Sequence, residues 1–236
     1  MDKTNYTVGF WSALIAFVAT MAFNIAQFLQ LLGVLTYPID QILIYGFSLC
    51  IVIPFMLAML ALHYVALADK KLWSHAALLF TVIYVVFVTS NYVVQLATVI
   101  PMTLKGAAEE VGILNQTPHS LFWDFDAIGY IFMGLATLFA VPVFKKQGFQ
   151  KWVKHCFLVH ALVTPLIAFV YFYPNFSDTL LLIGIPWAIT APLSMLMLTL
   201  MFKKELRSNL PPITFALDRE GKQSTRKTKV ISKQNR

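Results

Sequence analysis

The stretch from Ile42 to Leu67 reads ILIYGFSLCIVIPFMLAMLALHYVAL and contains no Asp, Glu, Lys or Arg. A helix needs about 20 mostly apolar residues to cross the hydrocarbon core of a bilayer. The stretch exceeds this length, and its few polar side chains, such as Tyr45 and Ser48, carry no charge. It therefore predicts a transmembrane helix.

Five similar apolar runs lie on either side of this stretch. The six predicted helices cover about residues 8–35, 42–67, 75–101, 126–144, 156–174 and 178–202. The first run is too long for the apolar core of a cleaved signal peptide, so we expect a retained helix. The sequence predicts an all-α, polytopic membrane bundle over residues 1–205. A basic tail follows at 206–236 and is too polar to bury a core of its own.

The composition agrees with this fold class. Hydrophobic residues make up 58% of the chain and charged residues 12%, whereas soluble domains average about 45–50% apolar and about 25% charged residues. A soluble enzyme, a disulfide-rich secreted module and a nucleic-acid-binding domain are excluded. Cys50 and Cys156 fall at different depths of different predicted helices, so no disulfide is expected.

Lysine and arginine are distributed unevenly among the predicted loops. With the N-terminus in the cytoplasm, 17 of the 18 basic residues lie on the inner side, and Lys105 alone lies outside. Cytoplasmic loops carry the excess of Lys and Arg in membrane proteins, so both termini are predicted to be cytoplasmic and the 103–125 loop external. Tryptophans are expected at both interfaces, with Trp11, Trp73 and Trp152 near the inner one and Trp123 and Trp187 near the outer one.

The net charge of +7 belongs to the segment from Lys203 to Arg236, because the rest of the chain has equal numbers of basic and acidic residues. One interpretation is that this tail only fixes the orientation. The other is that it binds anionic membrane lipids or a cytoplasmic protein. Neither implies a nucleic-acid partner.

Polar side chains recur at helical spacing on one face of each predicted helix. A rotation of 100° per residue places Asn91 with Gln95 on the third helix, and Asp126 with Tyr130 on the fourth. Lipid tails cannot satisfy amides or a carboxylate, so these faces are expected to point into the bundle. Most of the side chains lie from the midplane outward, which favours a ligand site in the outer half.

The expected function is to bind or transport a small polar or cationic ligand at that site. Asp126 would supply a negative charge, Tyr130 an aromatic wall or a hydroxyl group, and the amides neutral hydrogen bonds. The outer loops are net acidic, which would attract cations. The expected ligand-binding residues are Asn91, Gln95, Asp126, Tyr130, Asn24 and Gln27.

His63 and His160 lie on the polar faces of the second and fifth predicted helices, in their inner halves. Intramembrane histidines can relay protons, so they are candidates for that role. The sequence contains no zinc-protease, nucleophile-elbow, phosphate-loop or dinucleotide-binding motif. No metal or cofactor is therefore expected.

Three other interpretations stay open. The polar faces could serve only to join helices through hydrogen bonds. The chain could be a membrane-embedded enzyme acting on a lipid-like substrate, with His119, Asp124 and Asp126 in acid–base roles. It could also be a structural or regulatory subunit whose basic tail recruits a partner. Separately, Pro54 and Pro165 near the middle of corresponding helices would fit an inverted repeat of two three-helix halves.

The middle of the chain, about residues 85–145, resembles a known pattern. The residues that carry it are Asn91-Tyr92-Val93-Val94-Gln95, Glu110, Pro118-His119-Ser120 and Asp126-Ala127-Ile128-Gly129-Tyr130. They are similar to a pattern in uncharacterised six-helix prokaryotic inner-membrane proteins. The resemblance implies a six-helix bundle in a plasma (inner) membrane, and it implies no catalytic role for any residue.

Overall fold

The computed structural model describes residues 3–208 and consists of helices and their connections, with 86% helix and no strand among these residues. The chain divides into two units, residues 1–206 and 207–236, and the description below concerns the first. The basic tail predicted from residue 206 therefore lies almost entirely outside the described residues. The helices, in chain order, are α1 (Lys3–Leu31), α2 (Ile39–Val65), η1 (Ala68–Lys70), α3 (Lys71–Val94), η2 (Gln95–Val99), α4 (Ile100–Leu104), η3 (Glu109–Leu114), α5 (Leu121–Ala140), η4 (Val141–Val143), α6 (Phe149–Phe172), α7 (Asp178–Leu181), η5 (Leu182–Gly184) and α8 (Ile185–Ser208).

Six stretches of these helices are long and apolar enough to cross a membrane. They are Lys3–Leu31, Ile39–Val65, Ala68–Leu104, Leu121–Val143, Phe149–Phe172 and Thr179–Ser208. The outward faces carry large apolar side chains, including Phe28 (60% exposed) and Leu162 (64% exposed). Monomeric soluble proteins rarely expose an apolar surface of this size to water. The six-helix, all-α prediction is confirmed, and the surface is compatible with a multi-pass membrane protein.

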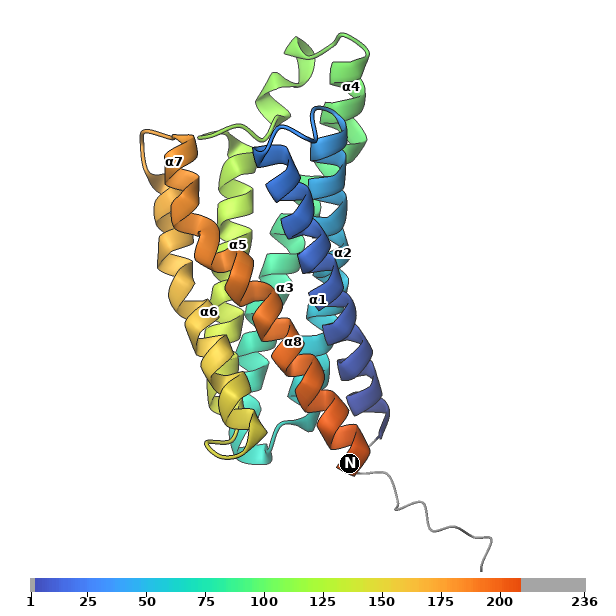
Figure 1. Ribbon diagram of the computed structural model, residues 1–236, viewed down its shortest axis with the longest axis vertical. Coiled ribbons are helices and arrows are strands. Elements are labelled where there is room, and N and C mark those ends of the chain that lie inside the picture. The colour runs from blue at the N-terminus through green and yellow to red at the C-terminus, as the bar shows by residue number, and fades with distance from the viewer. Residues whose placement is uncertain (1–2, 209–236) are drawn as a thin grey trace, which may run out of the picture. The chain divides into compact units, whose positions relative to one another are not determined.

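The six long helices pack as a closed ring. α1 packs against α2, α2 against α3, α3 against α5, and α5 against α6. α8 closes the ring by crossing the bundle obliquely, from α6 at one end to α1 at the other (Figure 1). Near one end of α8 the hydroxyl of Thr190 hydrogen-bonds to His160 of α6, and near the other the ring of Phe202 packs edge-on against Tyr6 of α1.

The connections define two ends of the bundle, and these names are kept below. The loop end carries the connections at residues 32–38, 105–120 and 173–177, and it lies at the top of Figure 1. The lysine end carries the connections at residues 66–70 and 144–148 and the start of α1. The sequence predicts that the loop end is external and the lysine end is cytoplasmic.

Glycines allow three of the helix pairs to approach closely. A Cβ atom added at Gly134 of α5 would overlap the side chain of Thr164 of α6, and one at Gly129 would overlap Val88 of α3. At Gly9 of α1 it would lie 2.5 Å from the ring of Phe202 of α8. Small residues at such contacts are how membrane helices gain packing contacts in the absence of a hydrophobic driving force between them.

The structure corrects several predicted helix bounds, and local interactions or backbone conformations explain the observed bounds. The fourth long helix begins at Leu121 and not at Asp126, because the Ser120 side chain caps it by accepting a hydrogen bond from the Trp123 N–H at 3.2 Å. The first ends at Leu31, just before Gly33, which has a positive φ of 68°. The fifth begins at Phe149, directly after Gly148 with a φ of 63°.

The third and sixth helices also differ from prediction. The third continues past Pro101 to Leu104, by way of the π-helical segment η2. The sixth begins at Asp178 as predicted but is interrupted by the 3₁₀ segment η5 and then runs on to Ser208.

Candidate functional site

A buried carboxylate joins three helices near the loop end. Asp126 of α5 is 3% exposed. Its Oδ2 accepts a hydrogen bond from the hydroxyl of Tyr171 of α6, and its Oδ1 accepts one from the side-chain amide of Asn91 of α3 at 3.3 Å. Among the residues that the structure describes, no lysine or arginine forms an ion pair with it. The predicted inward orientation of Asp126 and its proximity to Asn91 are thus found in the structure.

The predicted helix-end position of Asp126 is wrong. α5 begins five residues earlier, so Asp126 lies in its second turn, and Ser120 caps the helix. The hydrogen bonds from Tyr171 and Asn91, and not the first-turn N–H groups of the helix, satisfy the carboxylate.

The loop between α4 and α5 covers this cluster. The Asn91 amide donates to Oε1 of Gln116 at 3.0 Å. Gln95 binds the loop backbone twice: its side-chain Nε2 donates to the Leu114 carbonyl at 2.7 Å, and its Oε1 accepts from the Gln116 N–H at 3.2 Å. Asn91 and Gln95, two of the four amides predicted to contact a ligand, therefore hold this loop in place. We call Asn91, Gln95, Gln116, Asp126 and Tyr171 the Asp126 cluster.

Tyr171 and Gln116 are the members of the cluster that are absent from the predicted ligand-binding residues, and of the two only Gln116 lies outside the predicted helices. It lies in the long loop, where neighbours such as Asn115 and Thr117 are equally polar. Helical spacing carries no information about a loop, so nothing in the sequence distinguishes Gln116 from them.

A π-helical segment shapes the α3 side of the cluster. The segment η2 begins at Gln95, six residues before Pro101, whose ring nitrogen cannot donate a backbone hydrogen bond. A π-helical turn contains about one residue more than an α-helical turn. It therefore rotates the side chains of all later residues in this helix relative to a regular α-helix. A regular helix would place Thr98 on the same face as Asn91 and Gln95. The structure instead buries Val99 and Ile100 and leaves Thr98 half-buried. Segments of this kind are frequent at functional sites.

Aromatic side chains surround the cluster on the side of the bundle core. The hydroxyls of Tyr92 and Tyr130 hydrogen-bond at 3.0 Å, and the ring of Tyr92 stacks on Tyr45 with centroids 5.3 Å apart. Trp187 of α8 packs edge-on against Tyr130 at 5.0 Å. Trp123 supports Tyr171, since the ring centroids are 4.5 Å apart and the indole N–H donates to the Tyr171 carbonyl at 3.1 Å.

Four buried polar side-chain atoms of the described residues have no hydrogen-bond partner. They are Oδ1 of Asp40, Oγ of Ser48, Oδ1 of Asn91 and the indole Nε1 of Trp187. Buried polar atoms are almost always paired in proteins, and each exception requires an explanation. A free acceptor on Asn91, beside a carboxylate, is suited to a ligand that brings a hydrogen-bond donor.

The remaining predicted ligand residues have other partners. Asn24 of α1 donates to the backbone carbonyl of Ala188 of α8 at 2.6 Å. Gln27 donates to Gln30 at 2.7 Å, and Gln30 in turn donates to Asp40 of α2 at 2.7 Å. These contacts join α1 to its two neighbours in the ring, which agrees with the interpretation of these amides as helix-joining groups.

The two candidate relay histidines lie apart from each other. His160 is 2% exposed, and its Nδ1 hydrogen-bonds to the Thr190 hydroxyl at 3.0 Å. His63 is half-buried near the lysine end, where its Nδ1 hydrogen-bonds to the Ser74 hydroxyl at 2.9 Å. His160 is the nearer to the Asp126 cluster, through the ring of Trp187 at 6.4 Å.

The three residues considered for acid–base catalysis in the enzyme interpretation are buried to different degrees. His119 is exposed in the loop, Asp124 is half-buried and Asp126 is buried. Within residues 3–208, no group of three His, Cys, Asp or Glu side chains is arranged to hold a metal ion. The geometry of His119, Asp124 and Asp126 gives no support to a shared acid–base centre.

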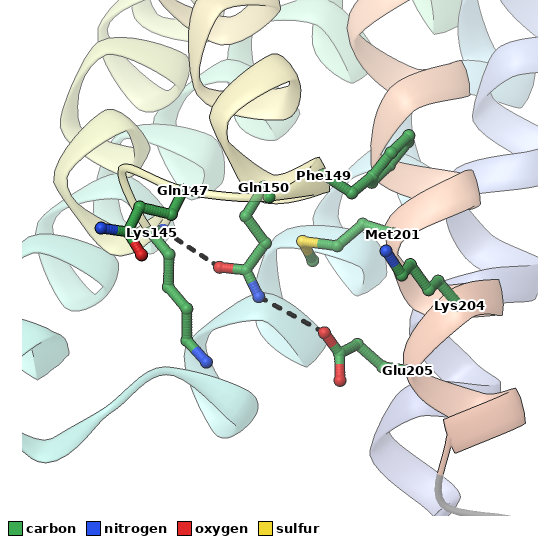
Figure 2. Close-up of a pocket in the computed structure, with 8 residues that line it drawn as sticks. Lys145, Gln147, Phe149, Gln150, Met201, Lys204 and Glu205 are labelled. Carbon is green, nitrogen blue, oxygen red and sulfur yellow. Dashed lines mark hydrogen bonds between the residues drawn. The ribbon is translucent and has the colours of Figure 1, made fainter.

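A pocket of about 160 Å³ lies at the lysine end, between the start of α6 and the end of α8 (Figure 2). Gln150 bridges it by accepting from the Lys145 N–H at 3.0 Å and donating to Glu205 at 3.5 Å. The residues that line it are Lys145, Gln147, Gly148, Phe149, Gln150, Met201, Lys204 and Glu205. Its basic and acidic side chains partly balance each other, and it lies at the opposite end of the bundle from Asp126.

Comparisons with protein-family models, with curated proteins and with solved structures give no match to this chain. The resemblance of residues 85–145 to six-helix prokaryotic inner-membrane proteins stays a prediction. The geometry around Asp126 is the basis on which a function can be assigned.

Proposed function

We propose that this chain is a multi-pass plasma-membrane protein that binds or transports a small polar or cationic ligand at the Asp126 cluster. The observation that carries the proposal is the carboxylate itself: Asp126 is buried, and its described partners are neutral donors. A carboxylate at this depth is costly unless it is compensated. A cationic ligand would supply the compensating charge that the described protein groups do not.

The surroundings support the same proposal. Aromatic rings border the carboxylate, and a cation is attracted to the face of such a ring. The loop that closes the cluster is held by side-chain hydrogen bonds from Asn91 and Gln95. We propose that the loop end faces the outside of the cell, so that the ligand enters from there.

A screen of small solutes tests the proposal. The purified protein in lipid nanodiscs would be mixed in turn with Na⁺, ethylammonium, acetate and urea, and its thermal unfolding midpoint measured. A ligand that binds only the native state raises this midpoint. We expect the midpoint to rise with a cationic or polar member of the panel and the rise to be absent in Asp126→Asn. A rise of equal size in Asp126→Asn would contradict the proposed site.

A further inference from the structure

The pocket at the lysine end lies where two helices diverge. α8 crosses the bundle obliquely, so it leaves the start of α6 on its way to α1 (Figure 1). The pocket of about 160 Å³ lies between the start of α6 and the end of α8. A single buried water needs about 10–15 Å³, so the pocket has room for a group as large as a phosphate with its ester oxygens.

Lysines are concentrated around this pocket. Residues 144–154 and 201–206 contain six lysines and one acidic residue, Glu205. Within residues 3–208 the only ion pair joins Lys70 to Asp69, so none of the six has a carboxylate partner there. The surroundings of the pocket therefore favour an anion. The six are Lys145, Lys146, Lys151, Lys154, Lys203 and Lys204.

Two of the six lysines line the pocket itself. Lys145 directly precedes the turn into α6, and Lys204 lies on α8. Figure 2 shows the Gln150 side chain with Lys145 on one side and Lys204 on the other. The Lys204 ammonium group lies 5.8 Å from the centroid of the Phe149 ring, which also lines the pocket. Ammonium groups from two helices can contact different oxygens of one phosphate group.

Glu205 limits the charge of the anion that fits. It lines the same pocket and accepts a hydrogen bond from Gln150 at 3.5 Å. With two lysines and one glutamate, the lining has a net charge of +1, which matches a group with a single negative charge. A ligand that also has hydroxyl groups can donate hydrogen bonds to a carboxylate. A phosphodiester of glycerol meets both conditions.

Trp152 indicates the depth of the pocket relative to a bilayer. It is exposed in the first turn of α6, beside the pocket. Tryptophans are enriched at the membrane–water interface, where their rings lie at the level of the lipid headgroups. The pocket is therefore expected at that level. Phe149 and Met201 give it an apolar wall, next to which the acyl chains of a lipid can continue along the bundle.

We propose that this pocket binds the headgroup of a singly charged anionic phospholipid, with the phosphate between Lys145 and Lys204. Basic pockets between membrane helices on the cytoplasmic side bind anionic headgroups, and the sequence predicts that the lysine end is cytoplasmic. Six lysines make this end of the bundle basic, and the pocket selects two of them. The site lies at the opposite end of the bundle from Asp126, so it does not depend on the proposed ligand site.

The test compares two double variants of the full chain that have the same total charge. The pocket variant combines Lys145→Ala with Lys204→Ala. The neighbour variant combines Lys146→Ala with Lys203→Ala, whose lysines are also exposed but lie outside the pocket lining. Native mass spectrometry in mild detergent measures the binding of dioleoyl phosphatidylglycerol to each. The pocket variant should bind this lipid at least about tenfold more weakly than the neighbour variant, a difference of about 1.4 kcal/mol.

Three outcomes would overturn the proposal. Equal affinities of the two double variants would show that the lysines attract the lipid only by their total charge. Equal binding of dioleoyl phosphatidylcholine and dioleoyl phosphatidylglycerol by the unmodified protein would show that the headgroup charge is not recognised. Displacement of the lipid by an equal concentration of inorganic phosphate would show that the pocket binds a soluble phosphate.

Single variants cover the case in which a double variant does not fold, as judged by size-exclusion chromatography. Lys204→Ala should bind dioleoyl phosphatidylglycerol about threefold more weakly than Lys203→Ala, because one of the two phosphate contacts is lost. The two lysines are adjacent on α8 and both exposed. Equal affinity of these single variants would also overturn the pocket as the lipid site.

Discussion

Tyr171 of α6 donates its hydroxyl hydrogen to the carboxylate of Asp126 of α5, and the two residues lie 45 positions apart in the chain. This hydrogen bond joins the loop-end halves of two neighbouring helices. It also fixes the carboxylate beside Asn91 of α3. The site is therefore built from the interior faces of the helices and is closed by a loop.

Tyr171→Phe removes the hydroxyl and leaves the ring in contact with Trp123. A hydrogen bond to a charged group contributes about 1.5–3 kcal/mol to stability, so we expect the free energy of unfolding to fall by about that amount. Thermal or denaturant unfolding in mild detergent measures it. Tyr173→Phe is the control, because Tyr173 is 41% exposed near the same helix end. Equal losses in the two variants would show that the Asp126 contact contributes little.

Gly134→Ala should destabilise the bundle by about 1–3 kcal/mol, as overpacking in a tight contact does. The added methyl group would overlap Thr164 of α6. Gly46→Ala in α2 is the control, since a Cβ atom there meets nothing within 4 Å. Alanine is the better helix former by up to about 1 kcal/mol, so Gly46→Ala should be neutral or stabilising. A neutral result for Gly134→Ala would contradict the close approach of α5 and α6.

The double variant Gly134→Ala with Thr164→Ala should recover part of the lost stability. Thr164→Ala removes the atoms that the new methyl group would overlap. The same unfolding measurement applies. If the two losses simply add, the substituted atoms do not meet in the folded protein.

Asn24→Ala should lower stability by less than about 1 kcal/mol, because polar contacts between membrane helices average about 0.6 kcal/mol. Asn24 donates to Ala188 of α8, so we expect its loss to weaken the junction of α1 with α8 and to leave ethylammonium affinity within about threefold, a change that corresponds to less than 1 kcal/mol. Unfolding and fluorescence titration of the same preparation measure both. A large loss of affinity would show that Asn24 is a ligand residue, as the sequence predicts.

The orientation is tested with topology reporters. Reporters fused after Lys71 or Lys154 should read cytoplasmic, and one inserted between residues 103 and 125 should read external. The reason is the concentration of 17 of the 18 basic residues on one predicted side. A cytoplasmic signal from the 103–125 insertion would reverse the proposed direction of ligand entry.

Periodicity was sufficient to predict the parts of the site that lie on regular helices. Asp126, Tyr130 and Asn91 are all buried, as the rotation of 100° per residue requires of an inward face. The same rotation would bury Thr98, but Thr98 is only half-buried, because the π-helical segment at Gln95 changes the phase of the helix. An irregular turn of this kind leaves no clear periodic signal in the sequence.

The burial of Trp123 and Trp187 is a feature that the sequence does not predict. Each is only 9% exposed, and both pack on residues of the site region. Trp11, Trp73 and Trp152, at the lysine end, are 57%, 41% and 61% exposed. Hydropathy places a tryptophan along the membrane normal, but it does not reveal whether the ring faces lipid or protein.

The affinity of ethylammonium for Asp126→Asn, compared with Asp124→Asn, tests the central claim most directly. The two aspartates lie on the same helix, and only Asp126 is fully buried in the cluster. Removing one partner of a buried charge pair costs about 2–5 kcal/mol, so Asp126→Asn should bind at least about 30-fold more weakly. Asp124→Asn should bind like the unmodified protein. Equal affinities in the two variants, both folded, would contradict a ligand site at Asp126.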